Sequence, residues 1–352
     1  MYRLNRYLVG LMCGVQLLVA PALSHAADLE DVLNMDVVVH IVDVGIGDAI
    51  LIELPNSEHE VIIDGGHAIK GFKALHYFED YIDGPIELAV ITHPDYDHWS
   101  GIKKLFDNDY QIQEFWDPGY DRKCKKNPEK DTYLKFIKEV KKEAAKSSPQ
   151  RKVLKLRRPF KITDPTPHFS LDNVTFTVLH SDDNPPGKEC AYITNNASMV
   201  IMMQYKKVRF LFAGDINGKE RDDRPSVEPK YIEGKLLQQE AKHPGLLKAD
   251  VYKVPHHGSE TANTRKFIKA VSPRFALISS SYDAHFELPT KRILRLYQRI
   301  RVDDREKIEK VLRTNYGESD YDHRNYGDDH IICGTNGDPD DIICDYIWNL
   351  GG

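Results

Sequence analysis

The chain has 352 residues, of which 41% are hydrophobic and 29% are charged, and its formal net charge at pH 7 is −6. These values are ordinary for a globular protein, and they exclude a fibrous or largely disordered chain. The negative net charge does not predict that the surface as a whole binds nucleic acid.

The N-terminal segment has the pattern of an export signal. A basic start precedes a largely apolar run over residues 7–23, and small residues occupy the −3 and −1 positions of a cut after Ala26. This pattern predicts a cleaved signal peptide, residues 1–26. An uncleaved anchor is the alternative, but the run is short for a spanning helix and is interrupted by glycines and a proline. We therefore expect a periplasmic or secreted chain of residues 27–352, with no transmembrane segment after cleavage and no predicted protein partner.

Four cysteines follow the signal segment, namely Cys124, Cys190, Cys333 and Cys344. In an oxidising compartment they would pair, and four cysteines allow three pairings. Cys333 and Cys344 each end a short β-like run, and a turn of Gly, Asp and Pro joins the two runs. We expect a disulfide across a C-terminal hairpin at about 330–348, which leaves Cys124 and Cys190 for each other.

Short β-branched runs alternate with turn signals from residue 37 onward, which indicates a β-rich core with helices between the strands. Residues 121–158 contain about three times as many Lys and Arg as Asp and Glu, and look like a basic insertion. The predicted strands are residues 37–42, 49–54, 61–66, 88–92, 174–179, 199–203, 208–212, 251–254 and 275–278, and the predicted helices are residues 74–81, 132–145, 231–242 and 288–300.

The strand at 88–92 leads into residues 93–98, His-Pro-Asp-Tyr-Asp-His. Two imidazoles and two carboxylates within six residues can turn toward one point, as a two-metal site requires. A solvated polar turn is the alternative. Two groups further along the chain favour the metal site, because each also comes directly after an apolar strand.

The first of these groups is Asp215, which Gly214 separates from the strand at 208–212. Glycine permits close backbone approach, and a carboxylate can bridge two cations. The second group is the pair His256 and His257, which follows the strand at 251–254. Alone, a carboxylate at a strand end is commonly a helix cap, and a histidine pair is commonly a surface turn. Together with residues 93–98 they predict a metal centre.

The order of these motifs resembles the metallo-β-lactamase superfamily, and within it the hydrolase domain of ComEC-type DNA-uptake proteins. In that branch the usual motif His-x-His-x-Asp-His carries Asp in place of its second His, as Asp95 does here. The resemblance spans roughly residues 37–290. The matching segments, in the family's order, are residues 43–49, 64–66, 93–98, 195–198, 214–215 and 256–259.

The resemblance implies an α/β fold, the metallo-β-lactamase-like αββα sandwich, with two divalent metals at the open edge between the sheets. His93 and Asp95 would hold one metal and Asp97 and His98 the second, with Asp215 between them. Asp95 replaces an imidazole by a carboxylate, so zinc is favoured and manganese is an alternative.

Several ligand positions stay open in the sequence. His256 or His257 would complete the second site, and the sequence does not choose between them. The family's usual third-motif histidine is not evident near Asn195; His180 lies before the expected place, and His285 is a candidate late ligand or substrate contact.

The two metals would make hydroxide available near neutral pH, and Asp97 is expected to orient the attacking water. Gly258 and Ser259 are candidate contacts for a phosphate. Among the acidic residues of the early turns, Asp48 is expected to shape its loop, whereas Asp64 could brace a histidine ligand.

The substrate is the least determined part of the prediction. The ComEC-like motifs imply a phosphodiester, possibly DNA, and Tyr133, Phe136 and Phe160 in and beside the basic segment could follow a nucleic-acid backbone. A charged helix is also commonly a solvated face, and the acidic stretch 316–341 would repel DNA near the site. The leading hypothesis is an exported phosphodiesterase or nuclease. The alternatives are a lactone, lactam or small-ester hydrolase, which a deep apolar pocket would favour, and a non-catalytic metal-stabilised module that binds DNA or the cell envelope.

Overall fold

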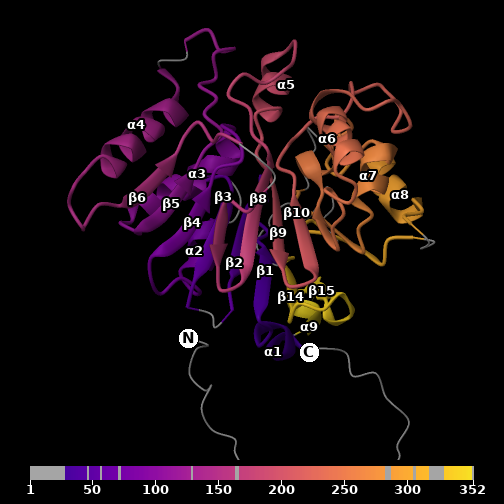
Figure 1. Cartoon of the computed structure of the whole chain (residues 1–352), viewed down its shortest axis with the longest axis horizontal. Helices are drawn as coiled ribbons and strands as arrows, with labels where there is room; N and C mark the ends of the chain where they lie inside the picture. The colour runs from indigo at the N-terminus through magenta and orange to yellow at the C-terminus, as the bar shows by residue number, and fades with distance from the viewer. Residues whose placement is uncertain are drawn as a thin grey trace, which may run out of the picture.

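Two mixed β-sheets face each other in the computed structural model, and helices cover the outer face of each sheet (Figure 1). This arrangement confirms the predicted α/β class and its αββα sandwich. The predicted signal peptide lies outside the described residues. The structure describes residues 28–45, 47–55, 58–69, 73–127, 130–162, 166–281, 287–303, 307–316 and 329–350.

The first sheet has parallel strands at one end and a hairpin at the other. Strands β3 to β6 pair in parallel, and the remaining pairs are antiparallel. In sheet order the strands are β15 (Ile343–Tyr346), β14 (Ile331–Thr335), β1 (Val37–Ile41), β2 (Ala49–Glu53), β3 (Glu60–Gly65), β4 (Ile86–Val90), β5 (Ile112–Trp116) and β6 (Val153–Arg157).

The second sheet pairs in parallel from β10 to β13 and antiparallel from β7 to β10. In sheet order its strands are β13 (Lys310–Arg313), β12 (Phe275–Ile278), β11 (Val251–Lys253), β10 (Val208–Phe212), β9 (Val200–Tyr205), β8 (Val174–His180) and β7 (Phe169–Leu171). The nine strands predicted between residues 37 and 278 are all present, with ends shifted by at most two residues.

The central core lies between the sheets, and strand β1 is covered on both of its faces. Val37, Val39 and Ile41 face the second sheet, whereas Val38 packs against Val32 of the short helix α1 (Leu29–Leu33). Since both faces of β1 are covered, four of its five residues are apolar. The polar residue, His40, is buried between Tyr77 and Glu53, which hydrogen-bond to its ring.

Helices close the outer faces of the two sheets. None in the described part of the chain combines the length and apolarity needed to cross a bilayer. The first sheet carries α2 (Ala74–Phe78), α3 (Tyr96–Asp107) and α4 (Thr132–Ala144), and the second carries α6 (Tyr231–Lys242), α7 (Arg265–Val271) and α8 (Lys291–Arg299). The short α9 (Ile347–Leu350) follows β15 beside α1, and the short α5 (Cys190–Asn195) lies apart from these layers.

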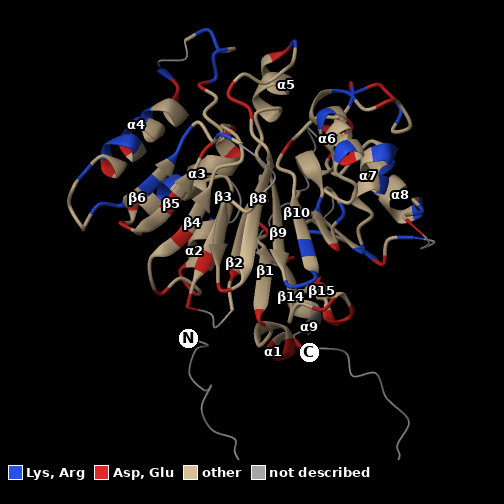
Figure 2. Cartoon of the chain, in the orientation of Figure 1, with Lys and Arg blue, Asp and Glu red and all other residues tan. Residues whose placement is uncertain are grey.

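The basic segment 121–158 contributes α4 and β6 to the first layer. Tyr133 and Phe136 of α4, and Phe160 beyond β6, are buried. The prediction that these aromatic rings line a nucleic-acid backbone is therefore wrong. The apolar stripe of α4 packs on the sheet, and charged residues of the helix face solvent (Figure 2).

Both expected disulfides are present. Cys333 and Cys344 lie opposite each other in the hairpin of β14 and β15 and are bonded. Cys124 is bonded to Cys190, the first residue of α5. The Cys124–Cys190 bond connects the basic segment to α5, and its two cysteines are 66 residues apart in the sequence.

Helix α3 crosses the end of β3 at a contact between two glycines. A Cβ atom added to Gly101 would lie 1.7 Å from the carbonyl oxygen of Gly65, and one added to Gly65 would lie 2.5 Å from the amide nitrogen of Ile102. Only glycine allows the two backbones to approach this closely. The contact therefore sets the position of α3 and of the side chains in its first turn.

We expect Gly101→Ala to lower the free energy of unfolding by about 1–3 kcal/mol, because its Cβ would force α3 away from β3. Urea denaturation followed by tryptophan fluorescence measures the change. Gly84→Ala is the control, since a Cβ there has no heavy atom within 4 Å. Equal stabilities of the two variants would contradict the proposed role of the contact.

Candidate metal centre

Loops at one edge of the sandwich bring the three predicted ligand groups together. Helix α3 starts with Asp95 as its N-cap and carries Asp97 and His98 in its first turn. Asp215 follows β10, and His257 lies in the short 3-10 helix η2 (Pro255–Gly258) after β11. These residues therefore come from the carboxyl ends of neighbouring parallel strands in both sheets.

Asp215 is the centre of the cluster. Its Oδ2 lies 3.9 Å from His93 Nε2, 3.5 Å from His98 Nε2 and 3.3 Å from His257 Nε2. Asp95 Oδ2 lies 3.6 Å from His93 Nε2. Ligand atoms about 2.1 Å from a tetrahedral ion are roughly 3.4 Å apart, so these separations are those of groups that share a cation.

The converging atoms also have no hydrogen-bond partner among the described residues. Nε2 of His93, His98 and His257 and Oδ1 of Asp215 are all buried and unpaired. Buried polar atoms are normally satisfied, and a divalent cation would satisfy these. The side chains therefore fit two cations, one beside His93, Asp95 and Asp215 and one beside Asp97, His98, His257 and Asp215.

The opposite ring nitrogens are fixed by acceptors. His98 Nδ1 lies 2.8 Å from Asp64 Oδ2, and His257 Nδ1 lies 2.9 Å from the carbonyl oxygen of Ser279. Such contacts set the tautomer and leave Nε2 as the free lone pair. Asp64 thus braces His98, as the sequence suggested.

The side chains of the adjacent residues His256 and His257 point in different directions and have different neighbours. His257 directs Nε2 toward Asp215, whereas His256 has Nδ1 2.8 Å from Thr261 Oγ1 and Nε2 3.3 Å from the amide of Asn195. Both residues have φ near +50°, a left-handed conformation that is uncommon outside glycine. This backbone sends the two rings in different directions, so His257 is the ligand candidate for the second metal.

Lys253, which the sequence interpretation did not name, and Asp48, which it expected to shape its loop, complete the surroundings of His257. Lys253 forms a buried ion pair with Asp48, and Asp48 Oδ1 lies 3.4 Å from His257 Nδ1. Burial would raise the pKa of Asp48, but Lys253 and His257 hold it below its usual value. The available signal was Lys253 itself, a charged residue within the apolar run of β11.

The buried carboxylates at this edge of the sandwich favour the protonated form of the neighbouring His257. Burial lowers the pKa of His257, but Asp215 and Asp48 raise it to about 10. Burial likewise raises the pKa of Asp215, but the charges of His257 and His98 hold it well below its usual range. A divalent cation would replace the protons on these histidines, so its binding would release protons.

The other predicted site residues lie at varying distances from this cluster. His180 ends β8 with Nε2 3.3 Å from the carbonyl oxygen of Asn196, and belongs to none of the His/Asp groups found in the described ranges. Gly258 packs against Pro289, while Ser259 lines the cavity beside the cluster. His285 lies outside the described residues.

A cavity of about 310 Å³ opens beside the cluster. Its wall combines the acidic ligands with hydroxyl and amide groups and one guanidinium group. The residues include Asp95, Asp97, Asp215, His257, Tyr192, Asn195, Asn217, Arg221, Ser259, Thr261, Ser280 and Ser281.

The αββα sandwich and the His/Asp cluster at its edge are those of a metal-dependent hydrolase. Residues 42–281 match the family model of the metallo-beta-lactamase superfamily, so the chain belongs to this superfamily of hydrolases.

One curated relative supports the branch suggested by the motifs. ComE operon protein 3 of Bacillus subtilis (strain 168) is 26% identical over 158 residues, which are 45% of this chain and 17% of that protein. This chain thus corresponds to a small part of its relative's length.

Two solved structures are similar to this chain at low sequence identity. The metallo-beta-lactamase fold protein YhfI from Bacillus subtilis has a TM-score of 0.45 and 11% identity, and the match covers 80% of this chain and 98% of YhfI. The metallo-beta-lactamase superfamily protein ST1585 from Sulfolobus tokodaii has a TM-score of 0.33 and 17% identity, over 61% of this chain and 77% of that one.

We expect His257→Ala to weaken binding of one divalent ion by more than about tenfold, because it removes a direct ligand. His256→Ala is the matched control and should have a smaller effect, since Thr261 and Asn195 occupy its ring nitrogens. Metal content after equilibration with a competing chelator measures both. A larger loss in His256→Ala would reverse the assignment.

The pH dependence of the folding stability can show whether His180 is a buried core histidine or a metal ligand. Burial lowers its pKa from 6.5 to about 4. Because the unfolded chain takes up this proton first, the contribution of His180 is present above pH 6.5 and is lost as the pH falls toward 4.

We therefore expect the metal-free protein to lose roughly 2–3 kcal/mol more stability between pH 7 and pH 4 than its His180→Gln variant. Urea unfolding at the two pH values gives the difference. Parallel pH profiles would show that His180 is not held neutral by the fold.

Proposed function

We propose that this protein is an exported phosphodiesterase or nuclease that uses two divalent metal ions. The observation that carries the proposal is the set of hydroxyl groups and the guanidinium group that line the cavity beside the metal centre. Ser259, Thr261, Ser280 and Ser281 offer hydroxyl groups, and Arg221 offers a guanidinium group. These groups suit the oxygens of a phosphate.

The ligand set favours zinc and leaves manganese as the alternative. Imidazole suits zinc, and carboxylate oxygens suit manganese. The cluster offers both kinds of donor, from His93, His98 and His257 and from Asp95, Asp97 and Asp215.

In the proposed reaction, several side chains of this protein would each have a separate role. When bound, the two cations would supply a low-pKa water and offset the negative charge that develops on the phosphate. Asp97, on the first turn of α3, accepts a hydrogen bond from the attacking water and so orients it. Ser259, which is buried beside Thr261, donates to a non-bridging phosphate oxygen. Arg221, on the cavity wall, pairs with a phosphate oxygen or with the next phosphate of a longer substrate.

Export is part of the proposal. The N-terminal 26 residues have the composition of a cleaved signal, and the two disulfides are typical of a protein that folds in an oxidising compartment. DNA is the favoured phosphodiester because of the resemblance to ComEC-type hydrolase domains.

Hydrolysis of a lactone or other small ester is the second candidate. The observation that favours it is the size of the cavity, about 310 Å³, which is at the lower end for small-molecule pockets. A nuclease would bind most of its substrate outside such a cavity, with one nucleotide inside.

We expect metal-loaded protein lacking residues 1–26 to hydrolyse bis-p-nitrophenyl phosphate, and EDTA to abolish the reaction. Asp97→Ala should lower kcat by roughly 100-fold or more, because it removes the group that orients the nucleophile. Asp80→Ala, an exposed carboxylate outside the cavity wall, is the control. Single- and double-stranded DNA tested in parallel show whether the enzyme is a nuclease. Metal-dependent cleavage of lactones without cleavage of either diester substrate would contradict the proposal.

A further inference from the structure

We propose that Arg122 is a positioning residue for Asp95, and that the Cys124–Cys190 disulfide holds Arg122 in place. Together they would present one oxygen of Asp95 to the first metal ion. The inference rests on the metal centre of the proposed function and concerns the support of one ligand.

Asp95 is the least confined ligand of the first site. Its side chain is 31% exposed, compared with 0% for His93 and 6% for Asp215. A partly exposed carboxylate can rotate and hydrate unless neighbouring groups restrain it. Binding a cation would then require ordering the side chain, at the expense of affinity.

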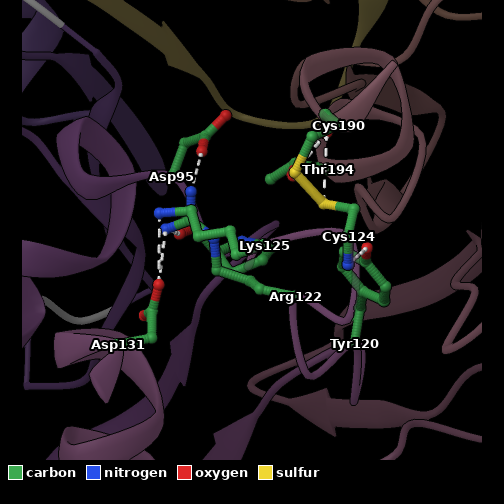
Figure 3. Close-up of a disulfide and its surroundings, with 9 residues drawn as sticks. Asp95, Tyr120, Arg122, Cys124, Lys125, Asp131, Cys190 and Thr194 are labelled. Atoms are coloured by element: carbon green, nitrogen blue, oxygen red, sulfur yellow. Dashed lines mark hydrogen bonds and ion pairs between the residues drawn. A yellow bond between two sulfur atoms is a disulfide. The ribbon is translucent and has the colours of Figure 1, made fainter. Parts of the chain in front are cut away.

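Arg122 restrains both the backbone and the carboxylate of this segment (Figure 3). Its Nη1 donates to the carbonyl oxygen of Pro94 at 2.8 Å, and its Nη2 donates to Asp95 Oδ1 at 3.1 Å. With Oδ1 held by Arg122, Asp95 turns Oδ2 toward His93 Nε2, 3.6 Å away. The guanidinium group therefore selects which carboxylate oxygen faces the metal position.

Arg122 itself depends on its surroundings for this geometry. Its φ of +49° lies in the left-handed region, which is uncommon for residues other than glycine. Its side chain is only 11% exposed, and Nη1 lies 3.6 Å from Asp131, the N-cap of α4. A residue in such a conformation persists only where neighbouring contacts hold it.

The disulfide supplies a covalent restraint two residues beyond Arg122. It joins Cys124 to Cys190, the first residue of α5 (Figure 3). Asn195 is the last residue of the same helix. With its amide oxygen toward His256, Asn195 places its nitrogen 3.0 Å from Asp95 Oδ2. The two oxygens of Asp95 are thus contacted from two chain segments that this one disulfide connects.

The second disulfide provides a matched comparison. Cys333–Cys344 links neighbouring strands of the edge hairpin, and neither residue lines the cavity. Replacing Cys333 and Cys344 by serine also removes one disulfide, but that disulfide is not connected to the segments that contact Asp95. Any general effect of losing a disulfide should therefore appear in both paired variants.

The experiment measures metal content and affinity of the full oxidised mature chain by competition with a chelator, without substrate. We expect Arg122→Met to weaken the binding of one of the two ions by about 10–100-fold and to leave the binding of the other ion unchanged. We expect the same result for Cys124→Ser/Cys190→Ser. Arg122→Lys should retain part of the affinity, because it keeps the charge but loses the paired contacts. Cys333→Ser/Cys344→Ser should bind both ions as the parent does.

Parent-like binding of both ions by Arg122→Met would overturn the role of Arg122. Parent-like binding by Cys124→Ser/Cys190→Ser, or equal losses in the two disulfide variants, would overturn the role of the disulfide. If the cysteine variant does not fold, Arg122→Met and Arg122→Lys still decide the first point. A parent protein that binds two ions but cleaves no phosphodiester would refute the proposed function and leave this inference intact.

Discussion

The convergence of three imidazole nitrogens on the buried carboxylate of Asp215 is the interaction on which the rest of the site depends. Buried charges and unpaired ring nitrogens are unfavourable unless a cation or protons balance them. The apolar layers outside each sheet and the core between the sheets hold the strands in place, so the loops that follow the strands bring the candidate metal ligands together at one edge.

Hydrogen bonds from backbone amides connect the loops at that edge to one another. The amide of Asp215 donates to Ser198 Oγ, and the amide of His256 donates to the carbonyl oxygen of Gly214. Gly214 has φ of +52°, and a Cβ there would lie 2.9 Å from Ser198 Cβ. This close packing explains why a glycine and a small serine occur in motifs far apart in the sequence, since a larger side chain at either position would separate the ligands.

The candidate ligands have different neighbours on the two sides of the site. On one side, the carboxylate of Asp95 is contacted by Arg122 and Asn195. On the opposite side, a buried Lys253 and Asp48 adjoin His257. The metal positions thus have different surroundings, one partly exposed and joined to a disulfide-linked loop, the other enclosed in the core. Such asymmetry suits a site whose two ions have different roles in orienting substrate and water.

Local apolar runs in the sequence were enough to predict most of the strands, and the order of the polar motifs at strand ends, through its resemblance to a known superfamily, was enough to predict the sandwich and the candidate ligands. Tertiary structure was needed to choose His257 over His256, since the direction of each ring depends on two left-handed backbone positions. It was also needed to bring Lys253 to Asp48, 205 residues away, and to bury Tyr133 against the sheet. Local patterns carry no information about which distant side chain will meet a given charge or ring, because that contact exists only after the layers have packed.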